Sequence, residues 1–364
     1  MKRFFPLLGL LLGLLATGCS RDNRCSHGVN VMEEAELLAI YDREDYDEVF
    51  IVNPKGEEVA HYVLIGREDT TKYTLPEGAV EIRVPLRNLV VDSEVYASAL
   101  EELEAHGSIK GMFDAGFVTS PYLKYRISGG AIADVGQSTS PNTEKILALA
   151  PEAIMVSYYD GMQTKEIDKL GIPLIKMYDL QEQTPLGRAE WLRFLGRLSG
   201  RAEETDSIYD AVAAAYRKEK GEAGTASIPK ILTEQMYEGV WYVPGGKSYQ
   251  ANLIKDAGGR YFMADDTKTG SLNLSAEQVL AKGGDADIWL IRFYGDGQTL
   301  RSVLESDPVY GEIKAYKEGD VFFSDTSESA LFREFPFHPD RLLRDYRIIF
   351  SGDSISPLHY FKKL

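Results

Sequence analysis

The sequence predicts an α/β protein of two lobes with mainly parallel sheets, joined by a single long helix. From Glu81 onward, short apolar runs such as "NLVV" and "AIMVS" alternate with segments of helical periodicity. This alternation requires crossover connections, and such connections are typical of parallel strands. Two helical patterns between Gly187 and Gly221 interrupt the series, and a second α/β series begins at Pro229. Each lobe would then be Rossmann-like, with helices on both faces of its sheet.

Composition limits the classes of partner. The chain has 364 residues, which suggests two domains, and 56 acidic against 40 basic side chains give a net charge of -16. No cluster of Lys and Arg is present that could bind a row of phosphates. We therefore expect no nucleic-acid partner.

The first residues predict export. Lys2 and Arg3 precede the apolar run from Phe4 to Ala16, which is too short to span a bilayer and has the layout of a signal peptide, here residues 1–18. The sequence "LLATGCS" that follows resembles the bacterial lipobox, which implies that Cys19 is lipidated and becomes the new N-terminus. An ordinary secretory signal that happens to contain a Cys is the alternative. Residues 19–40 are expected to form a flexible tether in which Cys25 is a free thiol without a partner.

The N-terminal lobe is expected to cover residues 41–186 and to begin with a hairpin. The runs "DEVFIVN" (Asp47 to Asn53) and "AHYVLIG" (Ala60 to Gly66) are typical of strands, and "PKGEE" between them is a turn signal. The alternating series of short strands and helices follows.

Residues 187–226 are expected to form a helical linker. Its second helical pattern begins with acids and ends with Arg217, Lys218 and Lys220, which complements the helix dipole. About twenty residues at ~1.5 Å each would give a rod of ~30 Å, long enough to join two lobes. The C-terminal lobe would then cover residues 227–364, with a last helix from about Pro339 to Phe350.

One supersecondary unit occurs twice. "SPNTEKILALAPEAIMVS" and "SLNLSAEQVLAKGGDADIWLI" each place a capping residue, a glutamate two positions later, an apolar pair and then a strand in the same order. The glutamates are Glu144 and Glu277, which are 277 − 144 = 133 residues apart. This match indicates an internal duplication of one lobe. A carboxylate in the first helical turn also stabilises the helix, so a purely structural role for both is the alternative.

With these motifs and the lipobox, the region from about Ile82 to Phe350 resembles the substrate-binding lipoproteins of bacterial ABC importers for ferric siderophores, haem and cobalamin. The resemblance implies two rigid lobes joined by one long helix and a ligand between them. It also implies that Glu144 and Glu277 dock onto arginines of an ABC permease. The implied protein is a monomer without catalytic residues, cofactor or resident metal. It is periplasmic and held by its lipid to the cell membrane or the outer membrane.

The ligand residues are predicted from topology. In open α/β sheets ligands lie beyond the carboxyl ends of the strands, and aromatic rings with a few arginines suit a large, flat or anionic chelate. These criteria select the following candidates: Ser93, Tyr96, Tyr158, Tyr159, Tyr237, Trp241, Tyr249, Arg292, Tyr294 and Arg333.

Other functions remain as alternatives. The sequence has no His-Glu-x-x-His, Cys-x-x-Cys, Gly-x-Ser-x-Gly or phosphate-binding glycine motif, which argues against an enzyme. The five histidines lack metal-ligand spacing, and His338 is expected to cap or pack against the last helix rather than to bind a bare metal ion. A surface adhesin would explain the lipobox but not two lobes around a cleft. The sequence does not distinguish a ferric siderophore or haem from cobalamin.

Overall fold

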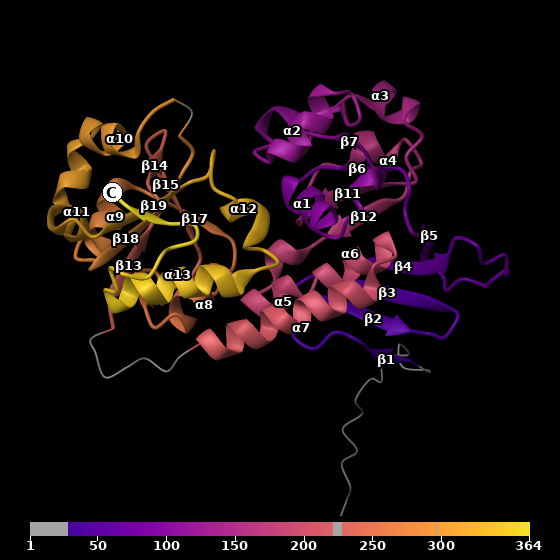
Figure 1. Cartoon of the computed structure of the whole chain (residues 1–364), viewed down its shortest axis with the longest axis horizontal. Coiled ribbons are helices and arrows are strands. Elements are labelled where there is room, and N and C mark those ends of the chain that lie inside the picture. The colour runs from indigo at the N-terminus through magenta and orange to yellow at the C-terminus, as the bar shows by residue number, and fades with distance from the viewer. Residues whose placement is uncertain (1–27, 221–227, 296) are drawn as a thin grey trace, which may run out of the picture.

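The computed structural model describes residues 28–220, 228–295 and 297–364. The predicted signal peptide, the predicted lipidation site Cys19 and the predicted free thiol Cys25 lie outside these residues. Within the described ranges no helix is both long enough and apolar enough to cross a membrane. Figure 1 shows two lobes side by side, with a row of helices connecting them along one edge.

A first sheet precedes the α/β series. Its strand order is β1-β2-β3-β4-β5, and β3 pairs with β4 in antiparallel register, which confirms the predicted hairpin. One face of this sheet packs into the core of the first lobe through apolar side chains such as Ile40, Ile51 and Leu64. The strands are β1 (Val29–Asn30), β2 (Leu38–Asp42), β3 (Tyr46–Val52), β4 (Glu58–Gly66) and β5 (Val80–Val84).

The sheet of the first lobe is parallel and has the order β12-β11-β6-β7-β8. Its central strands are continuous apolar runs, as expected for strands that are covered on both faces. The strands are β6 (Leu89–Val91), β7 (Ile109–Met112), β8 (Ala133–Asp134), β11 (Ala153–Ser157) and β12 (Leu174–Met177). The helices are α1 (Glu94–Glu102), α2 (Pro121–Ser128), α3 (Thr143–Ala148) and α4 (Lys165–Asp168), and a two-stranded ribbon of β9 (Gly136–Gln137) and β10 (Ser140–Pro141) precedes α3.

The sheet of the second lobe has the order β16-β13-β18-β19-β20, and its first four strands are parallel. The strands of this sheet are β13 (Lys230–Thr233), β16 (Arg260–Tyr261), β18 (Ile288–Phe293), β19 (Val321–Asp325) and the antiparallel edge strand β20 (Lys362–Lys363). A small antiparallel sheet contains β14 (Met236–Tyr237), β15 (Val240–Pro244) and β17 (Ser271–Leu274). The helices are α8 (Tyr249–Asp256), α9 (Ala276–Gly283), α10 (Leu300–Ser306), α11 (Lys314–Glu318), α12 (Leu331–Glu334) and α13 (Pro339–Ser351).

The two parallel sheets repeat one topology. The order β12-β11-β6-β7 in the first lobe corresponds to β19-β18-β13-β16 in the second. The helices that carry Glu144 and Glu277, α3 and α9, lead into the corresponding strands β11 and β18. The predicted fold class, two α/β lobes with mainly parallel sheets and a long connecting helix, therefore describes the structure.

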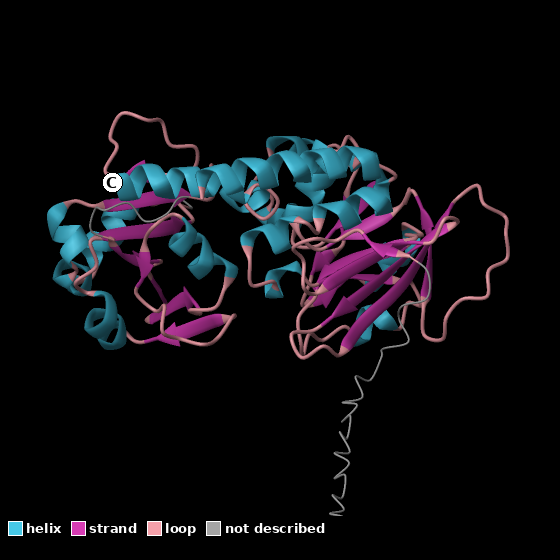
Figure 2. Cartoon of the chain, turned by 90° about the horizontal axis from the view of Figure 1, so that it is seen from below, coloured by secondary structure: helices cyan, strands magenta, loops and turns pink. Residues whose placement is uncertain are grey.

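The lobes are connected by α5 (Pro185–Ala189), α6 (Leu192–Ser199) and α7 (Ala202–Glu219). The 18 residues of α7 span about 27 Å. This helix packs on α6 and also on α13 of the second lobe, and the bridging row of helices is visible in Figures 1 and 2. The hydroxyl of Tyr216 donates to Asp256 Oδ2 at the end of α8, 2.8 Å away. Because its contacts reach both lobes, α7 serves as the predicted interlobe helix.

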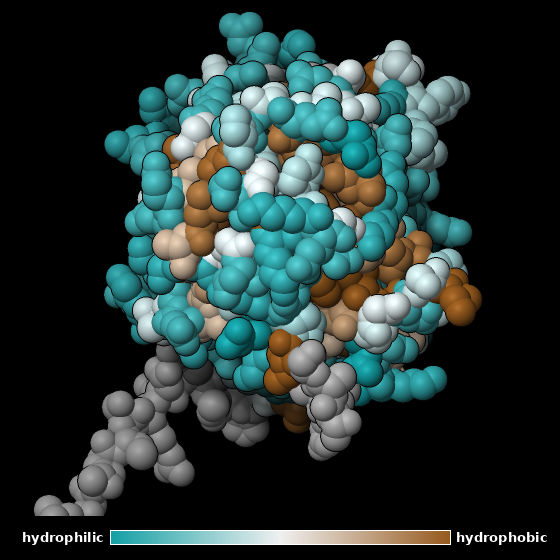
Figure 3. Space-filling model, turned by 90° about the vertical axis from the view of Figure 1, so that its left-hand side faces the viewer, coloured by the Kyte–Doolittle hydropathy of each residue, from teal (hydrophilic) through white to brown (hydrophobic). Residues whose placement is uncertain are grey.

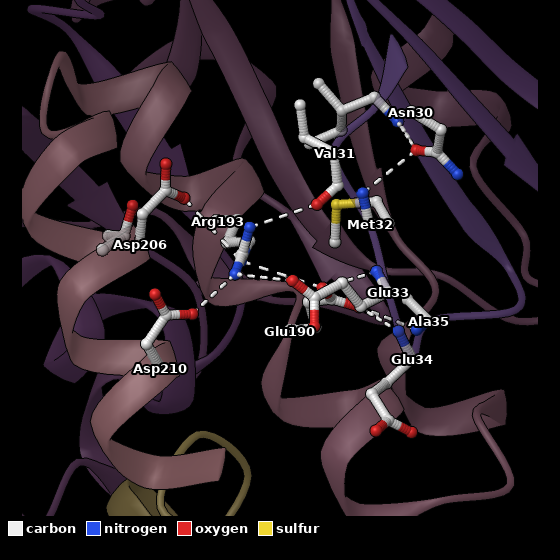
Figure 4. A network of polar contacts seen from close by, with 12 residues as sticks. Asn30, Val31, Met32, Glu33, Glu34, Ala35, Glu190, Arg193, Asp206 and Asp210 are labelled. Atoms are coloured by element: carbon white, nitrogen blue, oxygen red, sulfur yellow. Dashed lines mark hydrogen bonds and ion pairs between the residues drawn. The ribbon is translucent and has the colours of Figure 1, made fainter. Parts of the chain in front are cut away.

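The predicted tether is wrong for residues 28–40. Two buried carboxylates hold the segment between β1 and β2: Glu190 accepts hydrogen bonds from the backbone N–H groups of Glu33, Glu34 and Ala35 at 2.7–2.8 Å. Glu182 accepts from the next two N–H groups at 3.0–3.2 Å. We call the segment of residues 31–37 the strap; Figure 4 shows how it lies against the connecting helices.

Arg193 completes the attachment of the strap. Its Nη1 donates to the carbonyl of Val31 at 3.1 Å, and its Nη2 lies 2.9 Å from Asp210 Oδ1 on α7 (Figure 4). In the last turn of α7, Arg217 Nη2 lies 2.7 Å from Glu34 Oε1. The strap thus binds the first sheet to the connecting helices.

The outer end of the second lobe is mostly hydrophilic. Figure 3 shows teal surface over most of this side, with apolar groups in separate areas between polar ones. This distribution is consistent with the 26% of charged residues in the chain.

Candidate functional site

Each lobe has one point where ligands bind most readily in open α/β sheets. This switch point lies beyond the carboxyl ends of two adjacent strands from which the chain leaves in opposite directions. It falls between β6 and β11 in the first lobe and between β13 and β18 in the second.

The switch point of the first lobe carries an unusual carboxyl group. Asp92 follows β6 and accepts hydrogen bonds from the backbone N–H of Ser157 at 2.6 Å and from its hydroxyl at 3.1 Å, at the end of β11. Burial outweighs these bonds and raises the pKa of Asp92 to about 7.

Asp92 should make the stability of the protein depend on pH. An aspartate has a pKa of about 3.9 when unfolded, so the folded state holds the proton more tightly, and this stabilisation is complete below pH 4 and is lost as the pH rises through about 7. The free energy of unfolding of the wild type should fall by about 2 kcal/mol more between pH 5 and pH 8 than that of Asp92→Asn. Denaturant titrations at both pH values measure this difference, with exposed Asp168→Asn as the control. Equal pH dependence in wild type and Asp92→Asn would show that Asp92 titrates normally.

The carboxyl-end edges of the two parallel sheets meet across the lobes. Ser93 caps α1 by accepting from Val95 N, and Glu94 in the first turn accepts from the backbone N–H of Thr119 at 2.9 Å. Arg333 Nε, on α12 of the second lobe, lies 3.8 Å from Glu94 Oε1. Because α1 follows β6 and α12 follows β19, this contact brings the carboxyl ends of both sheets together across the lobes.

The switch point of the second lobe carries an ion pair. Glu234 directly follows β13, and its Oε1 accepts from Arg292 Nε at 2.7 Å on β18. The Cζ atom of Arg292 also lies 5.6 Å from the ring centroid of Phe332.

Exposed aromatic side chains follow the strands at these edges. Tyr159, Tyr237 and Tyr294 have exposed fractions of 52%, 67% and 51%, as expected for residues that could contact a ligand. Phe117 follows β7 and is 67% exposed, although the sequence did not indicate it as a candidate. Phe332 on α12 is 44% exposed. Tyr158 is half-buried, with Lys176 Nζ lying 4.7 Å from its ring centroid.

Three predicted ligand residues lie in the core instead. Tyr96 is buried and donates to Asp179 Oδ1 at 2.7 Å, and Trp241 is fully buried and donates from Nε1 to the carbonyl of Thr233. Tyr249 is buried at the start of α8. These side chains therefore present little surface to a ligand, because position near a strand end does not fix the direction in which a ring points.

Tyr96 and Tyr249 belong to a buried connection between the lobes. Arg188 on α5 donates from Nε to Asp179 Oδ2 at 2.9 Å, and Asp179 also accepts from Tyr96. On the side of the second lobe, the Cζ of Arg188 lies 4.6 Å from the ring centroid of Tyr249 and 5.2 Å from that of Phe335. The guanidinium thus joins a carboxylate of one lobe to two rings of the other.

His338 makes a second interlobe contact. As predicted, it lies just before the last helix, where it is buried, and its Nε2 is 2.9 Å from Glu102 Oε2 of α1. It lines an interlobe cavity of about 370 Å³ together with Arg333 and Arg341. In the described part of the chain no group of three or more His, Cys, Asp and Glu side chains could hold a metal ion.

The two predicted docking glutamates occupy matching positions. Glu144 and Glu277 are each the second residue of their helix, and both side chains are exposed. The preceding residues Asn142 and Ser275 cap the helices by accepting from backbone N–H groups at 3.0 and 3.3 Å. A hydrogen bond from Ser275 lowers the pKa of Glu277, so this side chain is charged at neutral pH.

With this geometry, the chain belongs to the periplasmic binding protein family, whose model matches residues 93–327. It is thus a binding protein of the ABC-transporter type, a class that binds substrates for transport rather than converting them. The first sheet lies outside the matched region.

Two relatives are lipoproteins of Methanocaldococcus jannaschii. One is 27% identical over 305 residues, which cover 80% of this chain and 72% of the relative. The other is 26% identical over 356 residues, which cover 89% of this chain and 90% of the relative. Because the second match covers nearly the whole chain, it extends beyond the region matched by the family model.

Solved structures of the family share the fold. A triscatecholate siderophore binding protein of Bacillus subtilis, complexed with ferri-bacillibactin, has a TM-score of 0.60 at 18% identity and covers 76% of this chain and 96% of its own. A periplasmic heme binding protein of Pseudomonas aeruginosa has a TM-score of 0.60 at 16% identity, with 76% and 97% covered.

Proposed function

We propose that this protein is the lipid-anchored substrate-binding subunit of an ABC importer. It captures an iron chelate, a ferric siderophore or haem, between its lobes and delivers it to the permease. The observation that carries this proposal is the Glu94–Arg333 contact, which brings the carboxyl ends of the two sheets together across the lobes, with exposed aromatic rings after strands of both sheets.

Ring chemistry supports a flat or aromatic ligand. Tyr159 of the first lobe and Tyr237 and Tyr294 of the second offer large, rigid surfaces that bury area at low cost in conformational entropy. Arginines at the same edge supply charge for an anionic group. The siderophore- and haem-binding proteins that share this fold bind ligands of this kind. Cobalamin is the alternative ligand, because its size and flat corrin ring suit the same rings.

Delivery and anchoring complete the proposal. Glu144 and Glu277 give one exposed carboxylate on each lobe, held at a fixed separation by the connecting helices, and such a pair can orient a basic partner as well as attract it. The lipobox at Cys19 and the lipoprotein relatives support a membrane anchor on the outer side of the cell membrane or on the outer membrane.

Thermal unfolding of the full-length protein in detergent tests the ligand class. Ferric bacillibactin, haem and cyanocobalamin are each added to the wild type and to Tyr159→Ala/Tyr237→Ala, with Tyr125→Ala as an exposed-tyrosine control. A ligand at a hundred times its Kd adds about 2.7 kcal/mol of stability, or roughly 3 to 6 °C for a chain of this length. We expect an iron chelate to give this shift in the wild type and the control, and a smaller one in the double variant. A shift with cyanocobalamin alone would favour the alternative, and no shift with any of the three would contradict the proposal.

A further inference from the structure

The ion pair between Glu234 and Arg292 has features beyond those of a structural salt bridge. Both guanidinium nitrogens Nε and Nη2 of Arg292 bond to the same oxygen of Glu234. Both side chains are mostly buried but retain some access to solvent. The exposed ring of Phe332 lies beside the guanidinium. The charged pair therefore lies at the carboxyl-end edge of the second lobe's sheet, where solvent reaches it, and not in the core of the lobe.

The backbone holds Glu234 in a strained conformation. Its φ of 62° is in the left-handed region, which residues other than glycine seldom adopt. Its N–H donates to the carbonyl of Leu290 at 2.9 Å, and its carbonyl accepts from Trp289 Nε1 at 2.7 Å. Strained residues cluster at ligand clamps and switch regions, where neighbouring contacts enforce them. Here the contacts fix the backbone while leaving the carboxylate at the end of a flexible side chain.

The first lobe lacks this charge arrangement. At the corresponding position after its first parallel strand, Asp92 bonds to Ser157 and not to a cation. The two edges therefore differ: one presents a carboxyl group bound to a serine, and the other an arginine bound to a carboxylate. Within the described residues, Glu234 is the ion-pair partner that the structure shows for Arg292.

We propose that Glu234 is an internal competitor for an acid group of the ligand at Arg292. This inference rests on the proposed function and names the ligand class, a chelate with a carboxylate or catecholate on a planar ring. Such a ligand displaces Glu234, pairs with the guanidinium and lays its ring near Phe332. Because Glu234 remains covalently tethered beside the arginine, it returns when the ligand leaves and so favours release to the permease. Neutral ligands gain nothing from Arg292, since they cannot replace the lost charge pair.

Binding constants test the competition. The full-length protein in detergent is titrated with ferric bacillibactin, haem and cyanocobalamin as wild type, Glu234→Gln, Arg292→Gln and Arg292→Lys. Asp287→Asn is the matched control, because it removes a carboxylate paired with Lys314 at the opposite end of β18. Glu234→Gln should tighten binding of the acid-bearing chelate about 10-fold, and Arg292→Gln should weaken it about 100-fold, with Arg292→Lys between wild type and Arg292→Gln. If the acid-bearing chelate binds the Glu234 and Arg292 variants as tightly as it binds the wild type, the inference is overturned and the proposed function stands. Binding of cyanocobalamin alone would overturn both the inference and the proposed iron-chelate ligand.

A ligand-free measurement separates the two claims. Phenylglyoxal modifies accessible guanidinium groups, and mass spectrometry follows the modification of Arg292. Glu234→Gln should raise its rate several-fold over wild type and Asp287→Asn, and benzoate, an acid on a ring, should slow it again. If no chelate binds but this pattern appears, the proposed function fails and the acid site at Arg292 stands. Equal rates in wild type and Glu234→Gln, or no protection by benzoate, would overturn the inference.

Discussion

Replacing Glu144 and Glu277 together by alanine should abolish uptake of the iron chelate in cells while leaving its affinity for the binding protein unchanged. Each glutamate is exposed at the start of a helix, one on each lobe, and neither supports the core. Loss of one charge-assisted hydrogen bond to a permease arginine should cost about 1.5–3 kcal/mol, or roughly 10- to 150-fold in docking affinity. Loss of both should reduce uptake to the level without binding protein.

Matched variants distinguish a specific docking role of Glu144 and Glu277 from an effect of the protein's net charge. Glu166→Ala and Glu305→Ala remove exposed acids from α4 and α10, so they change the net charge equally. Uptake of radiolabelled chelate is measured in cells that express equal amounts of each variant. Normal uptake by the Glu144→Ala/Glu277→Ala protein at normal ligand affinity would show that these glutamates do not dock the permease.

Glu190→Ala should lower the free energy of unfolding more than any other substitution named above. The substitution leaves the N–H groups of Glu33, Glu34 and Ala35 without their acceptor and removes the carboxylate 3.7 Å from Arg193 Nε. Breaking such a buried network costs about 3 to 5 kcal/mol, or roughly 4 to 7 °C in Tm.

A surface acid on α7 provides the comparison. Glu204→Ala removes an exposed carboxylate that lies 3.8 Å from Arg201, and such pairs contribute about 1 kcal/mol or less. Calorimetry of the three proteins measures both effects. A change in Tm for Glu190→Ala as small as that for Glu204→Ala would show that the strap is held by other contacts.

The alternation of strands and helices in each lobe could be predicted, because it depends on the local pattern of apolar and polar residues. Apolar runs such as Ala153–Ser157 and Ile288–Phe293 are fully covered strands, and the helix starts at Asn142 and Ser275 carry their own capping signals. The duplicated unit and the connecting helix followed from the same kind of evidence. Local pattern therefore sufficed for the fold class.

The strap could not be predicted from local pattern. Its hydrogen bonds join residues 33–37 to Glu182 and Glu190, between 145 and 157 positions away. A polar segment whose N–H groups bind distant carboxylates has the same composition as a flexible tether. The sequence therefore predicted a tether where the structure has a fixed segment.

The ligand edge could be predicted only in part. Topology selected Tyr159, Tyr237 and Tyr294, whose rings are exposed in the structure, but it could not give side-chain direction. Tyr96 follows β6 closely, yet it turns inward to Asp179, and the ring of Trp241 packs against Trp289. Phe117 was not selected, because no candidate was taken from the segment that follows β7, although its ring is exposed there. Glu234 gave no signal at all, since its importance depends on a partner 58 residues away and on its backbone conformation.

Equilibrium dialysis of the full-length protein against radioactive iron chelates tests the central claim most directly. The account predicts that one ferric siderophore or haem binds per protein with a Kd of ~1 μM or tighter, and that Tyr159→Ala/Tyr237→Ala weakens this binding while Tyr125→Ala does not. Failure to retain any iron chelate, or equal retention by the wild type and the double variant, would contradict capture between the two lobes.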